Sequence, residues 1–220
     1  SITSQRANEL DLEPMERRNS SLHETNFTIS VDAKKDTTTG ISAFDRSVTI
    51  KTLIDDNAKA IDLARPGHIF PIVGKDGGVL RRAGHTEASI DLSLLAGLKP
   101  SGVICEIMAD DGSMARGNEL EKFSRKHKLK ISSIADLIGY LRKKRKLVQR
   151  VESITLPTKF GKFDLHLYEG LFDNKTHLAL TKGDYISSES AMVRVHSECL
   201  TGDIFPVSYT HLTLPTTRYV

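Results

Sequence analysis

The sequence predicts an α+β fold, in which a layered domain with a mixed β-sheet and surrounding helices is followed by the start of a β-rich second domain. Up to residue 145, short apolar runs alternate with segments of helical periodicity that carry capping residues. From residue 151, apolar and polar positions alternate between glycine and proline residues, a pattern typical of strands. With 39% hydrophobic residues among 220, the chain is able to bury a core.

Local signals place the elements of the first domain. Residues 27–31 alternate like a half-buried strand, and Ser42 forms a capping box with Asp45 that starts a helix at Ala43. Ser133 starts a later helix in the same way. The other predicted elements are a helix at 87–98, a buried strand at 102–108, a helix at 118–126, a short strand at 129–132 and a helix at 135–146.

The second domain is predicted to consist of short strands. Turn residues such as Pro157, Gly161, Gly170 and Gly183 separate them. The predicted strands are 151–156, 163–168, 177–181 and 192–196.

Composition and charge exclude several function classes. The 31 basic and 28 acidic residues give a net charge of +3, too small to indicate a nucleic-acid binder. The basic run 142–146 closes a predicted helix, so a solvated helix end is favoured over a binding patch. No apolar run is long enough to cross a bilayer, and residues 1–14 lack the features of a signal peptide. Cys105 and Cys199 are read as unbridged, which is typical of a reducing compartment, so we expect a cytoplasmic chain. The small net charge and the lack of a membrane-spanning run lead us to expect no nucleic-acid and no membrane partner.

Two glycine-containing motifs carry the densest chemistry, one at residues 65–68 and one at 82–87. In the second, Arg82 offers a planar fork of donors, Gly84 permits close backbone approach, and the amides of the following helix point the same way. This combination suits a small phosphorylated ligand. His85 suits a divalent metal or proton transfer, although a single histidine in a glycine-rich turn is more often a surface or capping residue.

Glu106 interrupts the predicted apolar strand 102–108. An unpaired carboxylate there would be costly to bury, so we expect it to have a partner or to face a cleft near Arg82 and His85. Cys105 beside it is read as a small core residue. The residues by themselves therefore indicate a phosphosugar or nucleotide site.

The motifs also resemble a known family. Residues 39–46 (TGISAFDR), 65–71 (RPGHIFP), 82–87 (RAGHTE) and 102–108 with Asp110-Asp111-Gly112 are similar to successive signatures of the 3,4-dihydroxy-2-butanone 4-phosphate synthases. The resemblance covers about residues 1–145. It implies a homodimeric enzyme that uses Mg²⁺ or Mn²⁺ to convert D-ribulose 5-phosphate into 3,4-dihydroxy-2-butanone 4-phosphate and formate.

The resemblance also implies roles for individual residues. Glu106 and His68 are implied to be essential to the reaction, and His85 to bind magnesium. The metal would acidify the substrate and stabilise an enediolate, while a carboxylate moves protons. The residues implied to hold the sugar phosphate are Arg82, Ala83, Gly84, His85 and Thr86.

The second domain resembles the opening of GTP cyclohydrolase II at residues 156–163, 178–184 and 194–203, so the resemblance implies a bifunctional fusion. It implies that Cys199 is the first of three zinc cysteines, an incomplete Zn²⁺ site here because one thiolate does not make a zinc site. The residues implied to contact GTP are Arg194, Val195, His196, Ser197 and Glu198.

Departures from both families lead us to expect a chain cut at both ends. No segment of residues 1–26 matches the acidic magnesium-binding loop of the synthases, so we expect weak substrate binding and little turnover. Residues 207–220 depart from the cyclohydrolase pattern and are read as an artefactual tail after a domain at 151–206. The alternatives are a non-catalytic phosphosugar-binding or dimerisation fragment, GTP cyclohydrolase II as the main activity and, ranked well below these, an RNA-binding basic linker.

Overall fold

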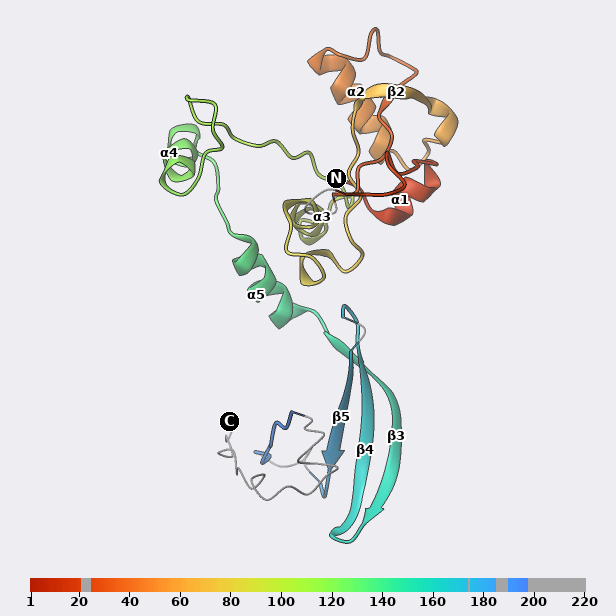
Figure 1. Ribbon diagram of the computed structural model, residues 1–220, viewed down its shortest axis with the longest axis vertical. Coiled ribbons are helices and arrows are strands. Elements are labelled where there is room, and N and C mark those ends of the chain that lie inside the picture. Colours follow the sequence, from red (N-terminus) through yellow and green to blue (C-terminus); the bar gives the residue numbers. More distant parts are fainter. Residues whose placement is uncertain (21–24, 174, 185–189, 198–220) are drawn as a thin grey trace. The chain divides into compact units, whose positions relative to one another are not determined.

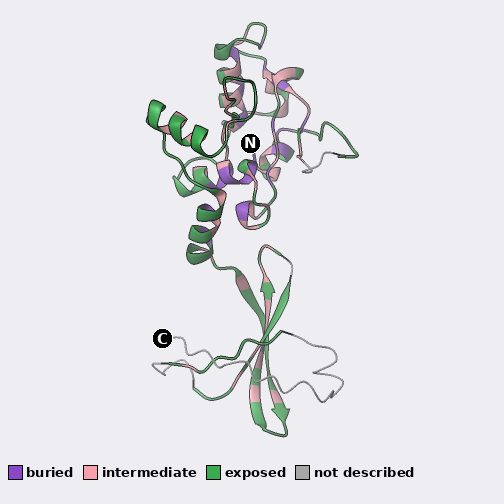
Figure 2. Cartoon of the chain, turned by 60° about the vertical axis from the view of Figure 1, so that its left-hand side comes forward, coloured by how far each residue is buried: buried purple, intermediate pink, exposed green. Residues whose placement is uncertain are grey.

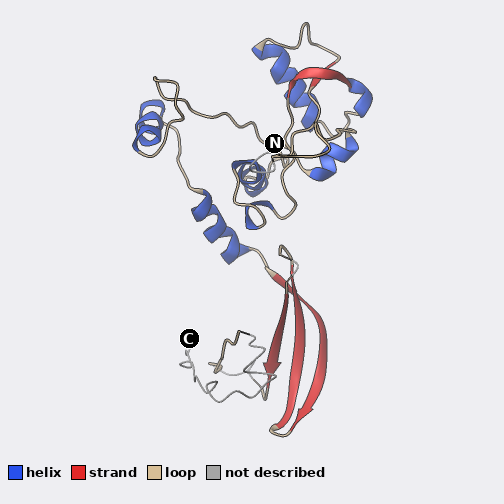
Figure 3. Cartoon of the chain, in the orientation of Figure 1, coloured by secondary structure: helices blue, strands red, loops and turns tan. Residues whose placement is uncertain are grey.

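The computed structural model describes residues 1–20, 25–173, 175–184 and 190–197 (Figure 1). The chain divides into two compact units, one of Ser1–Leu147 with Leu171–Asp173 and one of Val148–Gly170 with Asn174–Val220. Unit 1 combines helices with short strands, and unit 2 contains a β-sheet, as Figure 3 shows. The predicted α+β class is confirmed.

Unit 1 carries most of the helices of the described chain. Its helical elements are α1 (Ser4–Glu9), α2 (Ala43–Ile54), the 3₁₀ turns η1 (Ala60–Asp62) and η2 (Gly78–Leu80), α3 (His85–Leu95), α4 (Asn118–His127) and α5 (Ile134–Lys144). Its strands are β1 (Val31–Ala33) and β2 (Leu63–Ile69).

The two strands of unit 1 pair antiparallel, with Asp32 opposite Ala64 and a register shift between Val31 and Asp32. Isolated bridges lie outside these strands, and among them Ile2 pairs parallel with Val73 whereas Phe27 pairs antiparallel with Ile72. The named strands of the described residues pair antiparallel, so the mixed sheet that we expected is not seen in them. The apolar cluster beside it consists of Ile2, Ala7, Leu10, Leu12, Val31, Leu53 and Leu63.

Helix α2 begins where the capping box predicts. The Ser42 side chain accepts a hydrogen bond from the backbone N–H of Asp45 at 3.0 Å, which satisfies one amide of the first turn. The hydroxyl of Thr49, which is fully buried, accepts the N–H of Ala33 at 2.9 Å and donates to the carbonyl of Asp45 at 3.0 Å. Helix α2 is thereby fixed to β1, and its first turn is held beside the strand pair.

A second cluster joins α3, η2 and α5. Leu141 is fully buried, and its neighbours in the cluster are Val79, Ala88 and Leu137. Ser133 caps α5 by accepting the N–H of Asp136, as predicted. Figure 2 shows buried stretches in unit 1, whereas the strands of unit 2 are mostly exposed.

Unit 2 is an antiparallel meander of β3 (Val148–Thr158), β4 (Gly161–Gly170) and β5 (Thr176–Thr181), in that order. These strands confirm three of the predicted strands. His166 on β4 is 8% exposed, and its ring lies between the hydroxyl of Ser153 at 2.7 Å and that of Thr181 at 3.2 Å.

Several predicted strands are wrong. Residues 102–107 form no strand, and neither do 129–132 or 193–196. The strand predicted at residues 27–31 begins later, at β1, because residues 27–28 form only isolated bridges. Backbone hydrogen bonds decide these cases, because an apolar pattern becomes a strand only beside a partner strand.

In the described residues, no helix has both the length and the apolar character needed to cross a membrane.

Candidate active site

The turn that precedes α2 is held by a buried carboxylate. Oδ2 of Asp45, a residue 2% exposed, accepts the hydroxyl of Thr38 at 2.8 Å and the N–H of Gly40 at 2.9 Å. The hydrogen bond from the Thr38 hydroxyl, supported by backbone N–H groups, lowers the pKa of Asp45 below its usual value. The carboxylate therefore stays ionised at neutral pH and fixes the turn.

His68 on β2 is paired with Asp32 on β1. Oδ1 of Asp32 accepts the backbone N–H of His68 at 2.9 Å, and Oδ2 lies 2.7 Å from Nδ1 of the ring. The side chain of Asp32 is 13% exposed and that of His68 is 39% exposed. The imidazole is thus fixed at one nitrogen and accessible elsewhere.

Arg46 joins the turn before α2 to β2, which lie next to one another in Figure 1. Its Nε donates to the carbonyl of Ile41 and its Nη1 to the carbonyl of His68, both at 3.0 Å. Two motifs that are separated by 18 residues in the sequence, 39–46 and 65–71, therefore meet at His68.

The motif 82–87 folds around a second buried carboxylate. Glu87 has no exposed surface; its Oε2 lies 3.0 Å from Nε of Arg82, and its Oε1 accepts the N–H of Lys75 at 2.8 Å. A Cβ at Gly84 would lie 2.5 Å from Oε2 of Glu87, so only glycine allows the carboxylate to come this close. The close approach to the backbone that glycine permits at position 84 is thus made by the Glu87 carboxylate.

The other residues of this motif lie at the start of α3. Gly84 is the N-cap, His85 is the first helical residue and is exposed, and Thr86 is 6% exposed. Ala83 is exposed. The first-turn amides and the His85 ring are therefore presented at one end of the helix, where the helix dipole favours an anion.

The sequence model of the family described as 3,4-dihydroxy-2-butanone 4-phosphate synthase matches residues 1–140, and that of GTP cyclohydrolase II matches residues 149–212. The chain belongs to the 3,4-dihydroxy-2-butanone 4-phosphate synthase family. The second match corresponds to unit 2 and supports the resemblance of that part to GTP cyclohydrolase II.

Curated relatives match both parts. The riboflavin biosynthesis protein RibBA of Aquifex aeolicus is 53% identical over 207 residues, which are 93% of this chain and 51% of that protein. RibBA of Chlorobium phaeovibrioides is 52% identical over 205 residues, 93% of this chain and 50% of that protein. The chain spans about half the length of the curated relatives it matches.

Solved structures of the synthase family have the same fold. RibBX from A. baumannii, a two-domain 3,4-dihydroxy-2-butanone 4-phosphate synthase, has a TM-score of 0.75 and 43% identity, and the match covers 85% of this chain and 55% of that one. A synthase in complex with two magnesium ions has a TM-score of 0.58 and 38% identity, and the match covers 64% of this chain and 71% of that one.

The expected position of Glu106 in a buried strand is wrong. Glu106 is exposed in an extended segment that leads from α3 towards α4, not buried in a strand (Figure 1). Cys105 is likewise exposed, so it is not the core residue that we expected. The structure therefore gives no support to a common cleft of Glu106 with Arg82 and His85, which stays a prediction.

The described residues do not fit a complete magnesium site. No group of three or more His, Cys, Asp and Glu side chains comes together in the part of the chain that the structure describes. Glu87, the carboxylate nearest to His85 in the sequence, is occupied by Arg82 and the Lys75 amide. His85 alone supplies one nitrogen, whereas magnesium prefers several oxygen ligands.

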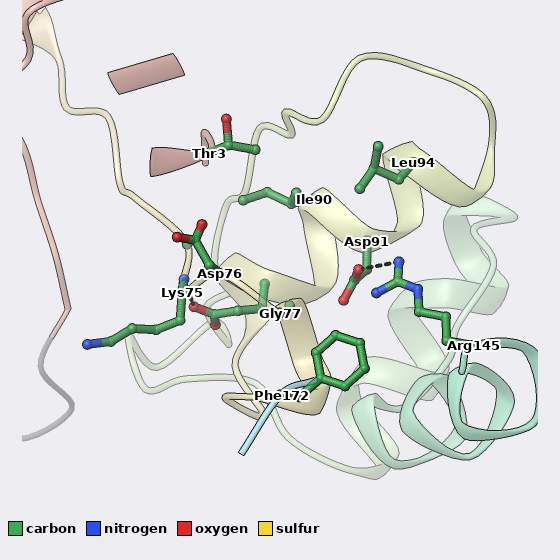
Figure 4. A pocket seen from close by; sticks show the side chains of 12 residues that line it. Thr3, Lys75, Asp76, Gly77, Ile90, Asp91, Leu94, Arg145 and Phe172 are labelled. Atoms are coloured by element: carbon green, nitrogen blue, oxygen red, sulfur yellow. Dashed lines mark hydrogen bonds and ion pairs between the residues drawn. The ribbon is translucent and has the colours of Figure 1, made fainter. Parts of the chain in front are cut away.

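A pocket of about 280 Å³ lies beside the synthase motif 82–87, along one face of α3 (Figure 4). Asp91 forms its charged side; it is 2% exposed, accepts the N–H of Val79 at 2.8 Å and pairs with Arg145 at 2.9 Å. The pocket lining contains Glu87 but none of the residues predicted to bind or transform the substrate.

The predicted GTP-contacting residues of unit 2 are only partly described. Arg194, Val195, His196 and Ser197 are exposed and lie outside any strand. Glu198, Cys199 and the tail 207–220 lie outside the described residues, so their predicted roles remain predictions.

Sequence reasoning missed Asp32, the partner of His68. The signal that singled out Glu106, a carboxylate inside an apolar strand-like run, is also present at Asp32 between Val31 and Ala33. The same test would therefore have found it. The inward orientation of Glu87 had no such signal, because first-turn acidic residues are common on exposed helix ends.

Proposed function

We propose that this chain carries catalytic parts of a lyase that converts D-ribulose 5-phosphate into 3,4-dihydroxy-2-butanone 4-phosphate and formate. The observation that carries the proposal is the meeting of two family motifs at His68, where Asp32 and Arg46 hold its ring and its backbone. Loss of formate from a sugar phosphate requires several proton transfers. A fixed imidazole with one accessible side suits such transfers.

The second part of the proposal concerns the phosphate group. Arg82, positioned by Glu87, and the first amides of α3 bind it, with Thr86 and the backbone of Ala83 and Gly84 completing the site. The ion pair between Arg82 and Glu87 supports this assignment, because it holds the guanidinium next to the helix end.

The domain assignment belongs to the same proposal. Residues 1–145 form the synthase domain, residues 151–206 form the start of a GTP cyclohydrolase II domain, and residues 207–220 are an artefactual tail.

The third part of the proposal concerns the metal and a second acid–base group. We assign His85 as one ligand of Mg²⁺ or Mn²⁺, with oxygen ligands that come from outside the described residues. We assign Glu106 a proton-transfer role that requires its exposed segment to move against the site. The bound metal would supply positive charge that stabilises an enediolate of the substrate.

Self-association is part of the proposal. Three apolar residues are exposed: Ile41 before α2, Phe44 in its first turn and Phe70 directly after β2, with 59, 70 and 52% of their surface accessible. Apolar exposure on this scale supports an interface, and we propose a homodimer. A cytoplasmic location and the absence of nucleic-acid and membrane partners remain predictions.

The test compares binding with turnover. The chain is titrated with D-ribulose 5-phosphate while the amide NMR signals of residues 82–86 are followed, and formate is measured in the presence of magnesium. The same assays are run on the chain extended by the acidic N-terminal segment of a synthase relative. His68→Gln is the active-site variant, and His177→Gln, which alters an exposed histidine of unit 2, is the control.

The lyase proposal expects binding by both forms, formate from the extended form, and loss of formate in His68→Gln but not in His177→Gln. Binding without formate from the extended form would favour the non-catalytic phosphosugar-binding alternative. A chain that binds no sugar phosphate overturns both. The GTP cyclohydrolase II alternative is supported by the match over 149–212, and a GTP ring-opening assay with zinc tests it separately.

A further inference from the structure

Asp32 contacts His68 through both of its carboxylate oxygens. Oδ1 accepts the backbone N–H at 2.9 Å, and Oδ2 lies 2.7 Å from Nδ1. Rotation of the ring about the Cα–Cβ bond would break the contact at Nδ1, and the bond from the backbone N–H keeps the carboxylate in place beside the ring. Asp32 lies in the middle of β1, which is paired with β2, so the carboxylate itself is fixed by the sheet.

The turn before α2 closes the Nδ1 side of the pair. Gly40 has φ of +83°, and a Cβ at that position would lie 2.5 Å from Cγ of Asp32 and 2.8 Å from Nδ1 of His68. Gly40 is itself held by the carboxylate of Asp45. No larger residue fits between the turn and the pair, and Nδ1 has no room for another partner.

The chemistry of the two groups then fixes the position of the proton. An ionised carboxylate only accepts hydrogen bonds, so the contact at 2.7 Å requires the hydrogen to be on Nδ1. In the neutral ring Nε2 must then carry the lone pair. Free histidine side chains mostly adopt the opposite tautomer, with the hydrogen on Nε2.

We propose that Asp32 is a positioning residue that holds neutral His68 in the Nδ1–H tautomer and leaves Nε2 as the nitrogen that takes up a proton from the substrate. The tautomer follows from the contacts alone, whereas its use in catalysis rests on the proposed lyase function. Asp32 does not contact the reacting atoms in this assignment; it acts through the ring that it orients.

The tautomer is measured directly on the chain as it exists. Long-range ¹H–¹⁵N correlation spectra of the ¹⁵N-labelled chain at about pH 8.5, roughly 2 units above the usual histidine pKa, distinguish the two ring nitrogens of neutral histidine. His68→Gln identifies the His68 signals. The proposal expects a protonated Nδ1 and an unprotonated Nε2 in the wild-type chain.

Variants then test the cause. Asp32→Asn should shift His68 towards the Nε2–H tautomer, whereas Asp36→Asn, at an exposed position of the adjacent turn, should leave it unchanged. In an active, extended form, Asp32→Asn should lower kcat by about 10- to 100-fold with a smaller change in KM.

An Nε2–H tautomer in the wild-type chain overturns the proposal without any variant, even if Asp32→Asn fails to fold. An Asp32→Asn chain that folds and keeps the wild-type tautomer also overturns it. An Nδ1–H tautomer that Asp32→Asn removes supports the positioning role, even if no form of the chain releases formate. The lyase proposal is decided separately, by the formate assay.

Discussion

The carboxylate of Glu87, which has no exposed surface, lies 3.0 Å from Nε of Arg82 and also accepts the N–H of Lys75 at 2.8 Å. Lys75 precedes the turn η2 and Arg82 follows it, so one side chain at the start of α3 ties together both ends of a loop. The phosphate-binding role proposed for Arg82 therefore depends on a residue that does not reach the ligand.

Replacing Glu87 with Ala should destabilise unit 1 by about 2–4 kcal/mol, because the Lys75 amide loses a buried acceptor and Arg82 loses its ion-pair partner. Urea unfolding measures this loss. Glu121→Ala is a matched control, since Glu121 also pairs with an arginine, Arg125, but both side chains are more than half exposed. The control should change stability by less than about 1 kcal/mol, and equal losses for the two variants would contradict the buried ion pair.

The lowered pKa of Asp45 predicts that the stability of the turn before α2 depends on pH. Its pKa is lowered in the folded chain, so its contribution to stability is complete above the unfolded value of about 3.9 and is lost as the pH falls through the lower folded value. Amide exchange of Gly40 should therefore accelerate beyond the general trend only in acid below about pH 4. Asp45→Asn should remove this acid dependence. A variant that shows the same acid transition as the wild-type chain would assign the transition to other carboxyl groups.

Substitution of Leu141 tests the packing of α5 against α3 and η2. The side chain is fully buried, so Leu141→Ala should cost about 2–5 kcal/mol through lost burial and a residual cavity. Leu98→Ala makes the same chemical change at a position that is 66% exposed and should cost less than about 0.5 kcal/mol. Thermal unfolding of the three chains gives the comparison. A small effect at Leu141 would mean that α5 does not pack on this cluster.

The accessibility of Cys105 tests whether residues 102–108 are exposed or form a buried strand. The structure exposes Cys105 and the segment around it, whereas the apolar pattern of 102–108 predicts a buried strand. Brief alkylation of the native chain, followed by mass spectrometry of its peptides, should therefore label Cys105 without denaturant. Protection of Cys105 until urea is added would mean that the segment is buried as the sequence predicts.

Helix starts and the hairpins of unit 2 were predictable because their determinants are local. Ser42 and Ser133 each cap a helix through a residue three positions later, and the alternation in β3 to β5 lies between turns that bring neighbouring strands together. The sequence also located the motifs that contain His68 and Arg82. It placed residues 102–108 wrongly because a strand depends on a partner: within the described part of the chain, no backbone hydrogen bond pairs residues 103–106.

The sequence by itself determined the family, the helix caps and the residue types from which the site is built. Only the tertiary structure decided which carboxylates act on which cations and rings: Asp32 turns to His68 across 36 residues, and Glu87 turns inward to Arg82 and Lys75. The physical reason is that a capping bond joins atoms that are already close in the chain. The direction of a buried carboxylate, in contrast, is set by whichever donors the folded backbone brings within about 3 Å of it.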